Sequence, residues 1–131
     1  MIVVDASAIT EFLLQTDLGQ RVEATLFQNS GDLHAPHLID VEIVQALRRL
    51  VRAGDVRADR ADEAIDDLGI LAIRRHPHFD LLGRAWALRE NLTAYDAMYV
   101  ALAEATDAPL VTCDAALAET PGHTAQIEVV R

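Results

Sequence analysis

Four acidic residues lie where predicted strands or helices would carry a carboxylate toward the interior: Asp5, Glu42, Asp96 and Asp114. Asp5 follows the apolar run Ile2–Val4, and Asp114 closely follows the run 110–112. Carboxylates are costly to bury alone, and several close together repel one another unless a cation holds them. Mg²⁺ prefers oxygen ligands of this kind. We therefore expect a metal site if the four side chains converge.

Three of the four acids also suit an ordinary structural role. Asp5 precedes a predicted helix and is suited to cap it, and Asp114 stands in the same position before a short helix at 115–119. Asp96 follows Thr93 at the spacing of a capping box. Capping and metal binding are compatible, so the residues alone leave both interpretations open.

Glu42 is harder to explain as a structural residue. Its predicted helix places it beside apolar side chains of one face, namely Leu38, Ile39, Ile43 and Ala46. An ionised carboxylate in such surroundings needs a partner. The structural alternative is a boundary residue paired with Arg49 or Gln45.

The elements that position these acids alternate between short apolar strands and helices. We predict strands at 2–4, 33–35, 71–74, 110–112 and 127–129. We predict helices at 6–15, 18–28, 36–53 (with Pro36 in its first turn), 58–68, 78–90, 93–107 and 115–119. This alternation is typical of an α/β fold with a largely parallel sheet, in which ligands bind at the carboxyl ends of the strands. Asp5 and Asp114 lie at that edge.

Length and composition narrow the class of protein. The chain has 131 residues, 51% of them hydrophobic, and no linker or repeat divides it, so we expect a single domain over 1–131. Its one cysteine, Cys113, excludes an internal disulfide. No apolar run reaches the roughly 20 residues that span a bilayer, and the first residues do not resemble a signal peptide. We therefore expect a cytoplasmic protein.

The charge distribution gives conflicting indications about nucleic acid. A net charge of −10 disfavours a polyanionic partner, although a bound cation would offset part of it. All eleven basic residues are arginine, which suits phosphate, and several cluster: Arg48, Arg49 and Arg52, then Arg74 and Arg75. Solvated surface arginines are the equally simple alternative.

Four segments together resemble PIN-domain ribonucleases, and more closely the VapC toxins of bacterial type II toxin–antitoxin pairs. They are Val3-Val4-Asp5-Ala6-Ser7, Glu42 in a helix that continues to Leu47-Arg48-Arg49, the run from Tyr95-Asp96 to Ala103, and Leu110-Val111-Thr112 with Asp114. The resemblance covers essentially the whole chain. It implies a three-layer α/β/α fold, RNA as substrate, and Mg²⁺ or Mn²⁺ as cofactor. It also implies that Asp5, Glu42, Asp96 and Asp114 form the acidic quartet, with Ser7 and Thr112 assisting.

The resemblance further implies protein partners. A small VapB-like antitoxin would silence the enzyme, and we expect its amphipathic segment to bind a groove that includes Ile9, Phe12, Leu13, and Ile43 or Leu50. The alternative is that these residues belong only to the hydrophobic core. We also expect a homodimer, with the helix at 97–105 and the segment 78–88 as candidate interfaces.

The hypothesis for mechanism is metal-assisted hydrolysis of RNA. Asp5 and Asp96 would hold Mg²⁺ directly, with Glu42 and Asp114 acting through waters or a second ion, and a water activated by the metal would attack the phosphodiester. Two rival functions remain. One is a phosphatase with an aspartyl nucleophile at Asp5, although such enzymes usually carry another acid at the position of Ser7. The other is a non-catalytic protein-binding module whose acids serve only as caps.

Overall fold

The computed structural model describes residues 1–28 and 31–131. Within these residues five strands form one sheet, and every pair is parallel, in the order β3–β2–β1–β4–β5. The strands are β1 (Ile2–Val4), β2 (Leu33–Pro36), β3 (Ile73–His76), β4 (Leu110–Thr112) and β5 (Ile127–Val129). The prediction of an α/β fold with about five short, mostly parallel strands is confirmed.

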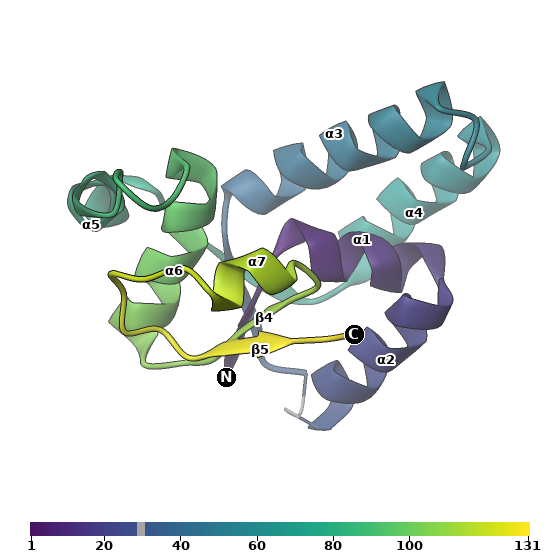
Figure 1. Cartoon of the computed structure of the whole chain (residues 1–131). Helices are drawn as coiled ribbons and strands as arrows, with labels where there is room; N and C mark the ends of the chain where they lie inside the picture. Colours follow the sequence, from purple (N-terminus) through teal and green to yellow (C-terminus); the bar gives the residue numbers. More distant parts are fainter. Residues whose placement is uncertain (29–30) are drawn as a thin grey trace.

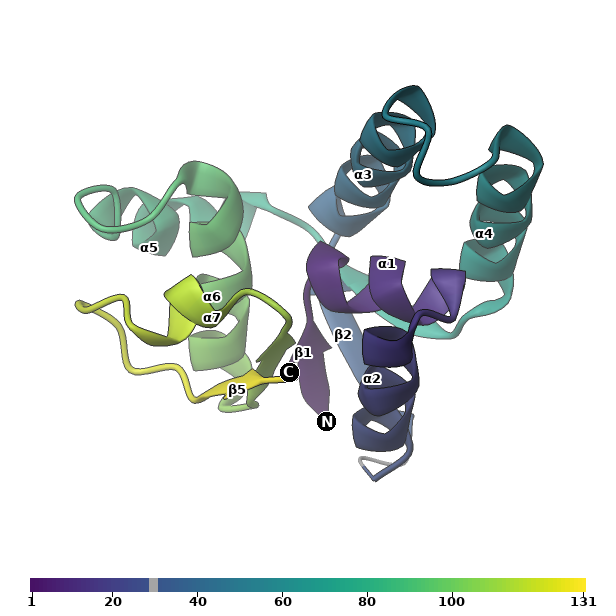
Figure 2. The same cartoon turned by 45° about the vertical axis from the view of Figure 1, so that its right-hand side comes forward.

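Helices flank the sheet on both sides (Figure 1). They are α1 (Ala6–Leu14), α2 (Asp17–Gln28), α3 (Leu38–Arg52), α4 (Ala58–Ile70), the 3₁₀ helix η1 (Phe79–Leu81), α5 (Leu82–Ala87), α6 (Ala94–Thr106) and α7 (Ala115–Ala118). Figures 1 and 2 both show α1 to α4 on one side of the molecule and α5 to α7 on the other. Every described helix is too short or too polar to cross a lipid bilayer.

The core is centred on β1 and α6. All three residues of β1 are fully buried, because strands lie on both of its edges and helices cover the sheet. Helix α6 packs on β1, β2 and β4, and its residues 97–103 are all buried. The prediction that the helix at 97–105 forms a subunit interface is therefore wrong for most of its length. That helix is apolar because it contributes to the core of its own chain.

Two predicted boundaries near the sheet are wrong by a few residues. Pro36 ends β2 rather than starting a helix, and α3 begins two residues later at Leu38. Pro36 pairs with His76 of β3, whereas β1 pairs only with Leu33 and His34 of β2. Pro36 therefore has a strand on one side only, and its missing N–H is tolerated there. Strand β3 likewise lies two residues later than the predicted 71–74.

The helix predicted at 78–90 is shorter and less regular than expected. Regular α-helix is limited to Leu82–Ala87, preceded by the 3₁₀ turn η1. Only Ala85 and Leu88 of the segment are buried, so packing stabilises little of it. Gly83 further lowers its helix propensity.

Candidate metal and catalytic site

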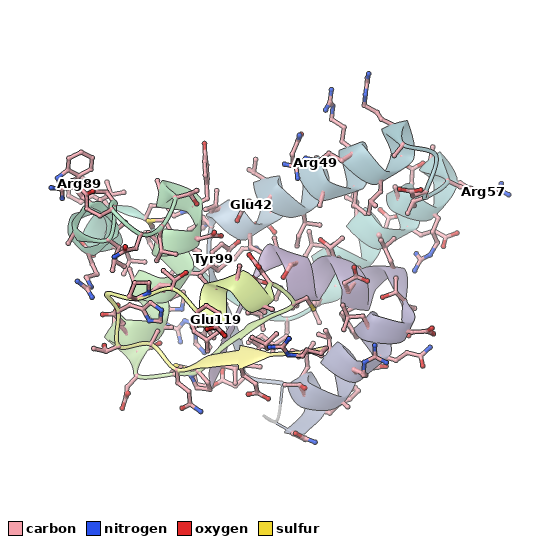
Figure 3. The ribbon with its side chains drawn as sticks, in the orientation of Figure 1. Glu42, Arg49, Arg57, Arg89, Tyr99 and Glu119 are labelled. Atoms are coloured by element: carbon pink, nitrogen blue, oxygen red, sulfur yellow. The ribbon has the colours of Figure 1, made fainter. Side chains whose placement is uncertain are left out.

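The candidate site lies where the strand order reverses. β1 pairs with β2 on one edge and with β4 on the other, although β4 comes much later in the chain. In open α/β sheets the crevice at the carboxyl ends of such neighbouring strands is the usual place for a ligand. Asp5 directly follows β1, and Asp114 lies two residues beyond β4. Figure 3 shows Glu42 on α3 and Tyr99 on α6, the two helices that lie above this edge.

Asp5 is held by hydrogen bonds from two strand ends. Its Oδ1 accepts from the hydroxyl of Ser7 at 2.7 Å and from the N–H of Ala8 at 3.0 Å, which caps α1. Its Oδ2 accepts from the hydroxyl of Thr112 at 2.5 Å. Asp5 is 9% exposed, so this carboxylate is fixed in the interior rather than dangling from a loop.

Ser7 and Thr112 also join the ends of β1 and β4 to each other. The N–H of Cys113 donates to Ser7 Oγ at 3.0 Å, and the N–H of Asp114 donates to Thr112 Oγ1 at 3.0 Å. Each hydroxyl therefore donates to Asp5 and accepts from the backbone after β4. Both residues therefore contact the carboxylate of Asp5, and their assistance in a reaction stays a prediction.

Burial nevertheless makes the charge of Asp5 unfavourable. Burial raises the pKa of Asp5 above its ordinary value, against the hydrogen bonds from Ser7, Thr112 and Ala8, and the carboxylate of Asp96 adds to the rise. Three donors do not compensate for the lost hydration. Among the described residues, no positively charged group lowers the pKa of Asp5.

Glu42 is half-buried and bound to a residue that the sequence did not single out. The hydroxyl of Tyr99 donates to Glu42 Oε1 at 2.6 Å, so Tyr99, rather than Arg49 or Gln45, is its hydrogen-bond partner among the described residues. Burial raises the pKa of Glu42, the carboxylates of Asp96 and Asp5 raise it further, and Tyr99 and Arg49 oppose the rise.

A signal for Tyr99 was present in the sequence. A tyrosine in the otherwise apolar run 97–103 needs a partner for its hydroxyl. Burial and the hydrogen bond to Glu42 both raise the pKa of Tyr99, so it remains a donor at any physiological pH.

Asp96 and Asp114 both begin helices, as the sequence predicted. Thr93 Oγ1 accepts from the N–H of Asp96 at 3.2 Å at the start of α6, and Asp114 Oδ1 accepts from the N–H of Ala116 at 3.0 Å at the start of α7. Asp96 is half-buried, whereas Asp114 is exposed. Burial raises the pKa of Asp96, and the charge of Asp114 raises it further.

The four acids are coupled by charge more than by contact. Among the described residues, no three acidic, histidine or cysteine side chains are close enough to form a ready-made metal site. Yet the charge of Asp96 raises the pKa values of Asp5 and Glu42, and the charge of Asp5 also raises that of Glu42. The charge of Asp114 in turn raises the pKa of Asp96. Carboxylate oxygens fit a hard divalent cation, and its charge would relieve this repulsion. The four carboxylates are therefore a donor set that suits a divalent metal ion.

A cleft of about 810 Å³ opens onto this edge of the sheet. Its lining combines polar side chains, among them Ser7, Glu42, Arg49 and Asp114, with apolar ones, namely Leu18, Leu38, Val41, Ala46 and Leu50. Cys113 also lines the cleft, but burial and the charges of Asp5 and Glu11 raise its pKa to about 11. Its thiol is thus protonated at neutral pH and unsuited to nucleophilic attack.

Comparisons with known proteins agree with this geometry. A model of the PIN domain matches residues 2–122. Ribonuclease VapC1 of Mycobacterium tuberculosis is 42% identical over 130 residues, 98% of this chain and 97% of that protein. Ribonuclease VapC9 of the same species is also 42% identical over 130 residues, covering 99% of this chain and 98% of that protein.

Two solved structures share the fold. PAE2754 from Pyrobaculum aerophilum superposes with a TM-score of 0.65 at 29% identity, over 98% of this chain and 83% of that one. Mycobacterium tuberculosis VapC20, described as a toxin that cleaves the sarcin–ricin loop, gives a TM-score of 0.63 at 16% identity, over 91% and 94%.

Proposed function

The chain belongs to the PIN-domain family, and on that premise we propose that it is a metal-dependent endoribonuclease, the toxin of a type II toxin–antitoxin pair. The observation that carries the proposal is the set of buried and half-buried carboxylates of Asp5, Glu42 and Asp96 at the strand-order reversal. Burial raises the pKa of all three, and the charge of Asp96 raises the pKa values of Asp5 and Glu42 further. Such an arrangement costs stability in the absence of a cation and is typical of a functional site.

Asp5 and Asp96 would hold Mg²⁺ or Mn²⁺, and Glu42 and Asp114 would contribute through waters or a second ion. When bound, the ion supplies a Lewis acid for the phosphoryl oxygens of RNA and for the attacking water. Ser7 and Thr112 orient the carboxylate of Asp5, and Tyr99 orients that of Glu42. Because its pKa is raised, Glu42 is also a better acceptor for a proton from water than an ordinary glutamate.

The phosphatase alternative fits the geometry less well. Such enzymes usually carry a second acid two residues after the nucleophile, whereas here that position is Ser7, whose hydroxyl donates to Asp5 Oδ1 at 2.7 Å. The alternative of a module whose acids are only caps explains Asp5, Asp96 and Asp114 but not Glu42, which lies inside α3.

An antitoxin would bind the cleft beside the acids. Its apolar lining residues suit one face of an amphipathic segment, and an arginine of the partner would reach the carboxylates. Leu50 lines this cleft, as expected. Ile9 and Ile43 do not, because both are fully buried in the core; the expectation that they line a groove is wrong. Phe12 and Leu13 lie beside a separate hollow next to Ile70 and Leu71.

A homodimer would use the segment 78–88. Here Phe79, Leu82 and Trp86 are 82%, 48% and 69% exposed, and a groove of about 560 Å³ lies beside them against Leu38 and Tyr95. Exposed apolar area of this kind marks an interaction surface. Light scattering of the wild type and of Trp86→Ser tests this, because a monomeric wild type would contradict it.

The function is tested by cleavage of RNA. Purified protein should cut single-stranded or structured RNA with Mg²⁺ or Mn²⁺, lose the activity with chelator, and regain it when metal is restored. Asp96→Asn and Glu42→Gln should abolish most cleavage while remaining folded, and Asp80→Asn, an exposed acid in η1, is the matched control. Folded Asp96→Asn and Glu42→Gln proteins that cut as fast as the parent would refute the site, and chelator-resistant cleavage would refute the metal requirement.

A further inference from the structure

The structure separates the eleven arginines of this chain by their partners, and six of them make no ion pair within the described residues. The other five form ion pairs: Arg57, Arg60, Arg75, Arg84 and Arg89. Three neighbours on α3, namely Arg48, Arg49 and Arg52, are exposed and make no hydrogen bond or ion pair within the described residues. In a chain with 21 acidic residues and a net charge of −10, three adjacent arginines without an acidic partner need an explanation.

The structure also separates the two clusters that the sequence could not distinguish. Arg75 binds both carboxylate oxygens of Asp40, at 2.7 and 2.8 Å, and so fastens β3 to the first turn of α3. At least one arginine of the cluster at 74 and 75 therefore has a structural role. The arginines at 48, 49 and 52 make no such ion pair within the described residues.

Their position relates them to the acidic site. Arg49 lines the same cleft as Glu42, and its charge opposes the rise in the pKa of Glu42. At 3.6 residues per turn, Glu42 and Arg49 lie almost directly in line along α3, about 10 Å apart along the axis, and Arg52 lies about 5 Å further. Figure 3 shows Glu42 and Arg49 on this helix, with Arg49 nearer its C-terminal end.

We propose that Arg48, Arg49 and Arg52 form a phosphate-binding row that holds the RNA backbone next to the acidic site. The inference rests on the proposed ribonuclease function and assigns it a substrate surface. Guanidinium groups bind phosphate oxygens in pairs, and three free ones on one helix form a local positive surface in a protein that otherwise repels RNA. Arg49 lines the cleft, Arg52 lies nearly one turn further from the acids, and Arg48 lies about 100° around the helix from Arg49. An RNA strand lying over this face of α3 would continue into the site.

A structural role for the row is a clear alternative. Arg49 and Arg52 stand in the last turn of α3, where positive charge stabilises the negative end of the helix dipole. That role predicts a loss of thermal stability on substitution and no specific effect on RNA. Measurements of thermal stability and of RNA binding therefore distinguish the two explanations.

The experiment compares two triple variants with the same change in net charge. Arg48→Gln/Arg49→Gln/Arg52→Gln removes the row, and Arg21→Gln/Arg74→Gln/Arg131→Gln removes three exposed arginines elsewhere that make no ion pair within the described residues. Each is made in the parent and in Asp96→Asn protein, which keeps the RNA intact. The probe is a fluorescent single-stranded RNA oligonucleotide, with Kd measured by anisotropy from low to moderate salt.

We expect the row variant to weaken binding about 10- to 100-fold at low salt and the control variant by only a few-fold. The slope of log K against log salt should become shallower by about 2, since each lost phosphate contact contributes about 0.7 for a single strand. Replacing the three arginines by lysine should restore most of the slope. The row variant should lose cleavage efficiency mainly through a higher KM.

Several results would overturn the inference. Equal losses in the two triple variants would mean that only net charge matters, and an unchanged Kd and slope with a lower Tm would assign the row to helix stability. If the row instead binds an acidic protein partner, the row variant would also bind RNA as the parent does. If the parent cuts RNA and the row variant cuts equally well, the row is wrong but the function stands; if the parent neither binds nor cuts RNA, the function itself fails.

Discussion

Asp5 and Asp114 are the same kind of residue in two neighbouring places. Each follows a buried strand, β1 or β4, and each caps the helix that comes next, α1 or α7. The surroundings differ completely. Asp5 is buried and accepts from Ser7, Ala8 and Thr112, whereas Asp114 is exposed and accepts from Ala116 alone.

The difference arises from the position of the strands in the sheet. β1 lies at the centre, so the residue that follows it is covered by α1, α6 and the end of β4. β4 has only β5 beyond it, and the short α7 leaves its cap in solvent. Two identical local motifs thus give one preorganised, electrostatically unfavourable carboxylate and one ordinary cap. We expect the first to dominate the chemistry.

The strongest test removes the charge of Asp5. Asp5→Asn keeps an N-cap residue but loses a metal ligand, and we expect RNA cleavage to fall about 100- to 1000-fold, which corresponds to roughly 3–4 kcal/mol of transition-state stabilisation. Single-turnover cleavage under saturating Mg²⁺ measures this. Activity within tenfold of the parent would remove Asp5 from the centre of the site.

The next test loosens Asp5 without touching it. Thr112→Val removes the hydroxyl that donates to Asp5 Oδ2 and leaves a buried acceptor without that donor. Residues that orient a metal ligand typically contribute 10- to 100-fold, and losing a buried hydrogen bond costs about 1–3 kcal/mol. Cleavage rate and urea unfolding measure the two effects. Unchanged values of both would mean that the contact does not hold Asp5 in place.

Tyr99→Phe applies the same test to Glu42. It deletes the hydroxyl that donates to Glu42 Oε1 while keeping the ring in the core. Because that hydrogen bond lowers the pKa of Glu42, its loss should raise this pKa and move the acidic limb of the pH–rate profile upward, with a loss of activity of about 3- to 10-fold at neutral pH. Thr106→Val, which deletes a hydroxyl at the other end of α6, is the control. An equal shift in both variants would contradict a role for the contact.

Asp114→Asn should have a smaller effect than any change at Asp5. Asparagine caps helices as well as aspartate does, and the side chain is exposed, so stability should change by less than about 0.5 kcal/mol. Loss of its charge near Asp96 should reduce cleavage by about tenfold or less. A loss as large as that of Asp5→Asn would break the comparison, because it would make the exposed acid an equal ligand.

The smallest effect concerns pH and stability in metal-free protein. The pKa values of Asp5, Glu42 and Asp96 are raised in the folded state, from ordinary values of 3.8, 4.5 and 3.8. The folded chain then binds more protons than the unfolded chain, so the free energy of unfolding should fall as pH rises from about 4 through the raised values and level off above them.

Urea unfolding between pH 4 and pH 8 with chelator measures this. One pKa unit corresponds to about 1.4 kcal/mol, and Mg²⁺ should recover much of the loss at the higher pH. In Asp5→Asn protein the fall should be visibly smaller. A free energy of unfolding that rises over this range would contradict the unfavourable charge at the site.

Local sequence determined much of this protein. The apolar runs of β1 and β4 identify buried parallel strands because a strand covered on both faces needs no polar alternation. The caps at Asp5, Thr93 and Asp114 are confirmed, since capping depends on residues within one turn. The weakly packed segment 78–90 was predicted least well, as its helix has little burial to stabilise it.

Tertiary structure alone decided which of these residues share a site. Sequence could not show that Thr112 reaches Asp5 or that Tyr99 reaches Glu42, because these partners are 107 and 57 residues apart and meet only when β4 and α6 pack beside β1. Nor could it tell Arg75, bound to Asp40, from the unpaired arginines of α3. Burial and charge are properties of the assembled neighbourhood, so the same aspartate is an exposed cap after β4 and a buried, mutually repelling carboxylate after β1.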